Sequence, residues 1–152
     1  MEQCIPIRIL IAEDHPVVRA GLVALINRRP DMVVVAEASN GLELVTQFLL
    51  HRPDVALVDL RMPEMDGADA IAAIRKQVPA ARAIVLTTYD DSEDIQRSLN
   101  SGARAYLLKD TPRKELLACI QAVHQGDTII PAGIATKLAA HVAADALRPP
   151  LN

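Results

Sequence analysis

The stretch Val55-Ala56-Leu57-Val58-Asp59, followed by Leu60-Arg61-Met62-Pro63-Glu64-Met65-Asp66-Gly67, decides the fold class. Its four leading apolar residues are typical of a buried strand, and the Pro-, Asp- and Gly-containing run after them is typical of a loop. A carboxylate at the end of such a strand lies at the edge of an open α/β sheet where ligands bind. Asp59 is therefore our first candidate for a functional residue.

Three other predicted strands end in polar side chains that suit a metal ion or a phosphoryl group. Acids follow one of them, a hydroxyl pair ends the second, and a lysine follows the third: Glu13 and Asp14 after residues 7–12, Thr87 and Thr88 after residues 83–86, and Lys109 after residues 105–108. Of the two threonines, we favour Thr87 because it directly ends the apolar run.

Strand-like and helix-like segments alternate five times along the chain. The predicted strands are residues 7–12, 32–38, 55–59, 83–87 and 105–108, and the predicted helices are residues 17–28, 41–51, 67–77, 91–100 and 112–124. Five such units predict an α/β fold with a doubly wound, five-stranded parallel sheet and helices on both faces. The flavodoxin-like strand order 2-1-3-4-5 is common for such sheets and places the first and third strands side by side.

Apolar spacing predicts which face of each helix is buried. In the first helix the stripe is Val18, Leu22, Leu25 and Ile26, and in the second it is Leu42, Val45 and Leu49. Asp66 is expected to cap the third helix.

Composition limits the class of protein. The chain has 152 residues, 51% of them hydrophobic, which suits one domain with an aliphatic core. Its net charge of −3 favours neither nucleic acid nor an anionic membrane. Cys4 and Cys119 lack metal-binding spacing and are expected to be free thiols. With no signal peptide or membrane span in the pattern, we expect a cytoplasmic protein.

The last 26 residues lie outside the repeating pattern. We expect residues 1–126 to form the main domain and residues 127–152 to form a linker helix, near residues 131–147, and a Pro-rich tail. Residues 127–152 carry two acids and two bases, so their net charge is zero. Because DNA binding depends mainly on basic side chains that neutralise phosphates, we expect no specific DNA binding by this chain alone.

The acids at adjacent strand ends predict a cation site. If the first and third strands are neighbours, Asp14 and Asp59 face each other, and three close carboxylates repel unless a hard divalent cation such as Mg²⁺ lies among them. Singly, each acid is readily explained as a cap or loop residue, and Lys109 as a solvated lysine. Tyr106 is explained equally well as core or as a movable side chain. The position of His15 next to Asp14 suggests a metal ligand or a base, but we favour an exposed loop residue beside Pro16.

Other phosphate chemistry fits the sequence poorly. An Asp-based phosphatase often needs a second Asp two residues on, where this chain has Arg61. The sequence contains no P-loop, no G-x-G-x-x-G after the first strand and no G-x-S-x-G elbow. We therefore expect a carboxylate that accepts and holds a phosphoryl group, and not a turnover enzyme.

These residues closely resemble the receiver domain of two-component response regulators, and more narrowly the subfamily with a LuxR-type (NarL/FixJ-like) helix-turn-helix output domain. The resemblance covers about residues 7–126. It rests on Ala12-Glu13-Asp14-His15, on residues 58–67, on Leu86-Thr87-Thr88-Tyr89-Asp90 and on Gly102-Ala103-Arg104-Ala105-Tyr106-Leu107-Leu108-Lys109-Asp110. Ala105 stands where many relatives have glycine.

The resemblance implies a role for each candidate. Asp59 would be the phosphoacceptor for a sensor histidine kinase, Lys109 and Thr87 would contact the phosphoryl oxygens, and Tyr106 would be the aromatic switch partner of Thr87. Mg²⁺ would be held by Asp14, Asp59 and the main-chain carbonyl of Arg61, with Glu13 helping through water.

The resemblance also implies partners. We expect homodimer formation on phosphorylation, and DNA binding only through a helix-turn-helix domain, which does not follow residue 150. The chain is either a receiver cut from a longer transcription factor or a natural single-domain regulator, and the Pro-Pro linker favours the first. Two other hypotheses stay open: a phosphorylation-independent protein- or ligand-binding module, and a small Mg²⁺-dependent phosphohydrolase.

Overall fold

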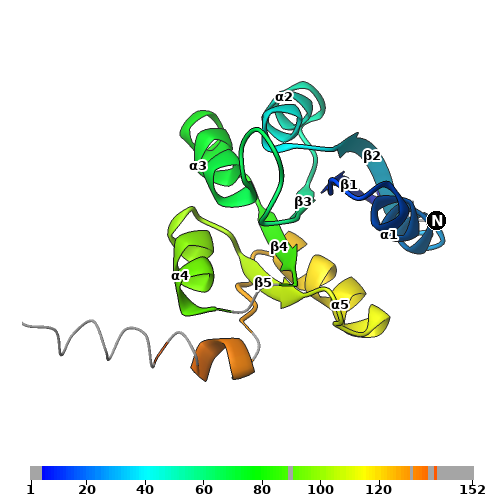
Figure 1. Ribbon diagram of the computed structural model, residues 1–152. Helices are drawn as coiled ribbons and strands as arrows, with labels where there is room; N and C mark the ends of the chain where they lie inside the picture. Colours follow the sequence, from blue (N-terminus) through cyan, green and yellow to red (C-terminus); the bar gives the residue numbers. More distant parts are fainter. Residues whose placement is uncertain (1–4, 89–90, 131, 137–138, 140–152) are drawn as a thin grey trace, which may run out of the picture.

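The structure, a computed structural model, describes residues 5–88, 91–130, 132–136 and 139. Its five parallel strands lie in the order β2-β1-β3-β4-β5, with helices on both faces, as Figure 1 shows. The strands are β1 (Ile7–Ala12), β2 (Met32–Ala38), β3 (Val55–Val58), β4 (Ala83–Thr87) and β5 (Ala105–Leu108); the helices are α1 (Pro16–Asn27), α2 (Gly41–His51), α3 (Gly67–Gln77), α4 (Ser92–Asn100) and α5 (Arg113–His124). The predicted fold class and strand order are confirmed.

The sheet is buried on both faces because successive strand residues feed two separate cores. In β1, Leu10 and Ala12 pack in the cluster that contains residues of α2, α3 and α4. Ile9 and Ile11 pack in the cluster that contains residues of α1 and α5. Burying each such isoleucine or leucine contributes about 1.5–3 kcal/mol relative to exposure. This two-sided burial explains why the strands read as continuous apolar runs.

Strand register fixes where the polar strand ends meet. β1 pairs with β3 in parallel, with Ala12 opposite Val58 at the end of both strands. The main-chain N–H of Asp59 donates to the carbonyl of Ala12 over 2.9 Å. The residues that follow these two strands therefore emerge side by side at the carboxyl edge of the sheet.

Side-chain caps set the starts of three helices. The side-chain oxygens of Asn40, Asp66 and Asp91 each accept a hydrogen bond from the main-chain N–H three residues later. Such caps stabilise a helix by about 1 kcal/mol. The predicted Asp66 cap is confirmed.

The predicted buried face of α2 is wrong by part of a turn. Leu42 is exposed, Val45 and Leu49 are only partly buried, and Leu44 and Phe48 are buried instead. Six apolar residues in this helix form two overlapping stripes, and spacing alone does not separate them. Leu44 and Phe48 lie four residues apart on one side of the helix, and the large phenylalanine ring favours burial of that side.

The apolar stripe of α1 is only partly covered. Ile26 is fully buried, whereas Val18 is 39% exposed, and Val17 beside it is 85% exposed. Leu22 and Leu25 pack partly buried against the second core cluster. The α1 surface thus keeps apolar area available to solvent.

Cys119 is a buried free thiol on α5. Burial raises its pKa to about 11, so it stays protonated and unreactive near neutral pH. Cys4 lies outside the described residues.

After α5 the chain returns to the sheet. Ile129 forms a parallel bridge with Ala105 of β5, and residues 132–136 form a short helix. Most of the helix expected over residues 131–147 lies outside the described residues. Within the described part of the chain, no helix is long and apolar enough to cross a membrane.

Candidate functional site

The candidate residues meet at the carboxyl edge of the sheet. Glu13 and Asp14 follow β1, Asp59 follows β3, and Lys109 follows β5. The main-chain N–H of Lys109 donates to the carbonyl of Thr87 over 2.8 Å, which fixes the start of the lysine loop against the end of β4. Four separate parts of the sequence thus supply one site.

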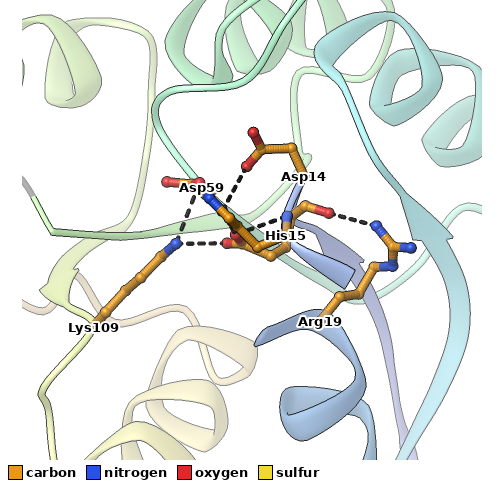
Figure 2. A network of polar contacts seen from close by, with 6 residues as sticks. Asp14, His15, Arg19, Asp59 and Lys109 are labelled. Carbon is orange, nitrogen blue, oxygen red and sulfur yellow. Dashed lines mark hydrogen bonds and ion pairs between the residues drawn. The ribbon is translucent and has the colours of Figure 1, made fainter. Parts of the chain in front are cut away.

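Lys109 joins two carboxylates, as Figure 2 shows. Its Nζ lies 2.8 Å from Oε2 of Glu13 and 3.3 Å from Oδ2 of Asp59. The lysine side chain is 19% exposed and the two carboxylates are nearly buried. At such separations and in a partly dehydrated site, the attraction of the charges is considerably stronger than between exposed groups.

Burial makes the Asp59 carboxyl unusually basic. Loss of water contact and the negative charge of Glu13 raise the pKa of Asp59 from 3.8 to about 6, although Lys109 acts in the opposite direction. For Glu13 burial is again the largest influence and raises the pKa, but hydrogen bonds from Lys109 and His15 outweigh it and hold the pKa of Glu13 below its usual value. The two pKa values thus shift in opposite directions: hydrogen bonds outweigh burial at Glu13, whereas burial dominates at Asp59.

The acids can hold a hard cation. Ligand atoms of Glu13, Asp14, His15 and Asp59 all lie within 4.8 Å of one another. Oδ1 of Asp14 is a buried atom for which no hydrogen bond is found among the described residues, although Nδ1 of His15 lies 3.2 Å away. A buried carboxylate oxygen without a donor is costly, and a cation would satisfy it. Carboxylate oxygens are the ligands that Mg²⁺ prefers.

His15 is closer to the acids than the sequence suggested. Its side chain is largely exposed, as expected of a loop residue, but Nδ1 lies 2.9 Å from Oε1 of Glu13. The hydrogen bond that the His15 imidazole donates to Glu13, and then the charge of Asp14, raise the pKa of His15. In the sequence, only the position of His15 directly after Glu13 and Asp14 indicated a contact with them.

Arg19 also supports the site without having been predicted. Its guanidinium donates to the main-chain carbonyl of Glu13 over 2.7 Å (Figure 2). It also lies 3.2 Å from the carboxylate of Glu37. One turn of α1 thereby holds the acidic loop in position.

The Arg61 side chain forms an ion pair with α4. Its Nη2 lies 2.8 Å from Oδ2 of Asp94 on α4, and Asp66 forms a second ion pair with Arg97 of the same helix. Arg61 and Asp14 line one hollow of about 490 Å³, which these ion pairs border. The loop after Asp59 is thus tied to α4, a connection that the sequence reasoning missed.

Thr87 and Tyr106 are both fully buried, whereas Thr88 is exposed. Thr87 ends β4, and Tyr106 belongs to the core cluster that also includes Ala12 and Val58, the last residues of β1 and β3. The structure therefore favours Thr87 over Thr88 as the inward hydroxyl, and it places Tyr106 in the core beneath the site.

Comparison with known proteins gives a consistent result. Residues 9–121 match the family model of the response regulator receiver domain. Oxygen regulatory protein NreC from Staphylococcus epidermidis is 39% identical over 132 residues, which cover 86% of this chain and 61% of that protein. The chain therefore spans about three fifths of the length of this curated relative.

Solved structures agree with this match. A LuxR-family two-component response regulator from Aurantimonas is 33% identical with a TM-score of 0.84, and the match covers 91% of this chain and 99% of that one. The receiver domain of the putative regulator NarL from Mycobacterium tuberculosis is 34% identical with a TM-score of 0.77, over 80% and 98% of the two chains. The chain belongs to the response regulator receiver domain family, with NreC-, NarL- and LuxR-type regulators among its homologues.

Proposed function

We propose that Asp59 accepts a phosphoryl group from the phosphohistidine of a sensor histidine kinase. The observation that carries this proposal is the contact of Lys109 with the buried carboxylates of Glu13 and Asp59. A cation and an acidic pocket next to one nucleophilic carboxylate form a suitable site for a phosphoryl group and its counterions.

The bonds that form and break in the transfer belong to Asp59 and the donor. An oxygen of ionised Asp59 attacks phosphorus, the phosphorus–nitrogen bond of the donor breaks, and the imidazole leaves with the bonding electrons. With a pKa of about 6, most Asp59 is ionised at neutral pH. Lys109 then pairs with a phosphoryl oxygen, and Thr87 donates to another.

Mg²⁺ fits the acidic part of the site and would neutralise charge on the phosphoryl oxygens. Its proposed ligands are the carboxylates of Asp14 and Asp59 and the main-chain carbonyl of Arg61, with Glu13 acting through water. The unsatisfied buried oxygen of Asp14 supports this assignment.

We further propose that Thr87 and Tyr106 form the switch. Phosphorylation adds nearly two negative charges and three acceptor oxygens. A hydroxyl drawn towards them leaves space into which the Tyr106 ring packs, and α4 and β5 respond. In a longer protein, residues 1–126 would act as the receiver that controls a DNA-binding, transcription-regulating output domain, and residues 127–152 as the linker.

Intact mass spectrometry tests the proposal. Incubation with Mg²⁺ and acetyl phosphate should add about 80 Da, the mass of one phosphoryl group, to the wild type and to Asp110→Asn, but not to Asp59→Asn. Asp110 is an exposed acid near the same edge, so it controls for a general loss of charge.

Other outcomes identify the alternatives. An unlabelled wild type would indicate a phosphorylation-independent binding module. Release of phosphate over many turnovers would indicate a phosphohydrolase, and slow loss of the label at one turnover would agree with autodephosphorylation of a receiver.

A further inference from the structure

The segment after α5 covers the free edge of the sheet. β5 is the last strand in the order, so its outer edge has no strand partner among β1–β4. Ile129 occupies part of this edge: it lies opposite Ala105 in a parallel bridge, and its N–H donates to the carbonyl of Arg104 over 2.9 Å. Such cover reduces the tendency of an open edge to pair with other chains.

The same segment inserts one side chain into the core. Ile134 is only 5% exposed, although its described helical neighbours Ala132, Gly133, Ala135 and Thr136 are exposed. In Figure 1 the orange segment leaves α5, passes behind β5 and ends in a short helix below α4. Among residues 132–136, Ile134 is the buried side chain, so the contacts of Ile134 hold this described part of the helix against the core.

The core that receives Ile134 is the one that contains Tyr106. Both belong to the cluster on the α4 side of the sheet, together with Ile95 of α4 and Ala103 before β5. Ile130 and Leu99 pack against the same cluster while partly buried. Tyr106 is 0% exposed, so its ring lies fully inside.

We infer that residues 127–130 and 132–136 belong to a clasp whose docking, through Ile134, is coupled to the position of Tyr106 and therefore to the phosphorylation of Asp59. The inference rests on the proposed function of Asp59. A well-packed core has little free volume, so an aromatic ring cannot leave it without its neighbours repacking. The docked clasp thus favours the conformation in which Tyr106 lies inside.

Thermodynamic linkage makes the coupling reciprocal. If the clasp favours the inward ring, and the inward ring favours a bound phosphoryl group, then removal of the Ile134 contact must weaken phosphoryl binding. In the other direction, an occupied site must hold the clasp more firmly. The chain that continues beyond residue 136 would then start from a position that depends on Asp59.

Beryllofluoride with Mg²⁺, a stable mimic of the phosphoryl group, tests both directions on the 152-residue chain. Hydrogen–deuterium exchange of peptides that cover residues 128–136 should slow in the wild type when the mimic is bound. The affinity for the mimic should fall about fivefold in Ile134→Ala. It should not change in Ile5→Ala, which makes the same chemical change at a side chain that is 87% exposed.

The outcomes separate this inference from the function on which it rests. If the wild type does not bind beryllofluoride, the proposed function fails. If it binds, but exchange over residues 128–136 is unchanged, the clasp is not coupled to the site. This exchange result needs no variant, so it remains decisive even if Ile134→Ala does not fold. Equal affinities of folded Ile134→Ala and wild type would also overturn the coupling.

Discussion

Lys109 lies closer to Glu13 than to the phosphoacceptor candidate: its Nζ is 2.8 Å from the carboxylate of Glu13 and 3.3 Å from that of Asp59. The hydrogen bond to Glu13 and the charge of Asp59 raise the pKa of Lys109 even though burial, the largest single influence, lowers it. Lys109 is therefore the cation that makes this cluster of acids tolerable without a metal ion.

Lys109→Met should lower the free energy of unfolding in Mg²⁺-free buffer by about 1–3 kcal/mol at pH 8, because buried carboxylates lose their counter-charge. The loss should shrink near pH 4, where the acids become protonated. Urea unfolding at the two pH values measures it. Lys114→Met, at an exposed lysine of α5, is the control and should have little effect. An equal loss at both pH values would indicate packing, not charge, as the cause.

Asp59→Asn should stabilise the Mg²⁺-free protein at neutral pH by about 1–3 kcal/mol. The Asp59 pKa rises from 3.8 to about 6 in the fold, so the folded state prefers the protonated acid. The favourable contribution of that proton is complete below about pH 4 and is lost as the pH rises through about 6. The wild type and the variant should therefore converge in stability near pH 4.

Denaturant titrations from pH 4 to pH 8 check this prediction, with Asp110→Asn as an exposed control. A variant that is less stable than the wild type at pH 7.5 would contradict it.

Mg²⁺ should bind weakly and stabilise the fold. At ten times its dissociation constant, free Mg²⁺ should add about 1.4 kcal/mol to the free energy of unfolding. Asp14→Ala should remove this gain, because Asp14 supplies a buried carboxylate oxygen that accepts no hydrogen bond from the described residues. Glu115→Ala, at an exposed acid of α5, should retain it. Amide chemical shifts should move around Glu13, Asp14 and Asp59, and an unchanged Asp14→Ala affinity would exclude the proposed ligand set.

Gly67→Ala should disturb the site through the main chain. A Cβ at Gly67 would lie 2.5 Å from the carbonyl oxygen of Asp59 and 2.7 Å from Cγ1 of Val58. We expect a loss of about 1–3 kcal/mol in stability and weaker Mg²⁺ binding. Gly21→Ala is the matched control: its Cβ would meet nothing within 4 Å in the interior of α1, so it should stabilise by about 0.5–1 kcal/mol. Thermal melts with and without Mg²⁺ compare the two variants, and equal effects would contradict the clash.

Self-association on phosphorylation should use the apolar surface of α1 and α5. Val17 of α1 is 85% exposed. A hollow of about 380 Å³ between α1 and α5 is lined by Leu22 and Leu25 of α1 and Leu116 of α5. Val17→Asp should lower the dimer fraction in sedimentation with beryllofluoride. Leu50→Asp, a charge placed at a 70% exposed residue of α2, should not. If neither variant alters the dimer, the surface formed by α4, β5 and α5 becomes the better candidate.

Local sequence patterns were enough to predict the fold class and the sheet edge that carries the candidate site. Runs such as Val55–Val58 are apolar throughout because both sheet faces are buried, so strand positions are readable from local pattern alone. Residues that end parallel strands must share one edge of the sheet. This rule alone predicts that Glu13, Asp14, Asp59 and Lys109 lie close together. Caps such as Asp66 were readable for the same reason, since a cap acts within one turn.

The contacts among the site residues depend on tertiary packing and were not predictable from local pattern. Three features depend on residues far apart in the sequence. They are the contact of Lys109 with Glu13, the ion pair of Arg61 with Asp94, and the burial of Ile134 in the core. The buried face of α2 was misread because two apolar stripes overlap, and the choice between them depends on the shape of the core. Local pattern fixes which side chains turn inward on average, whereas partners depend on packing between elements, which no single segment encodes.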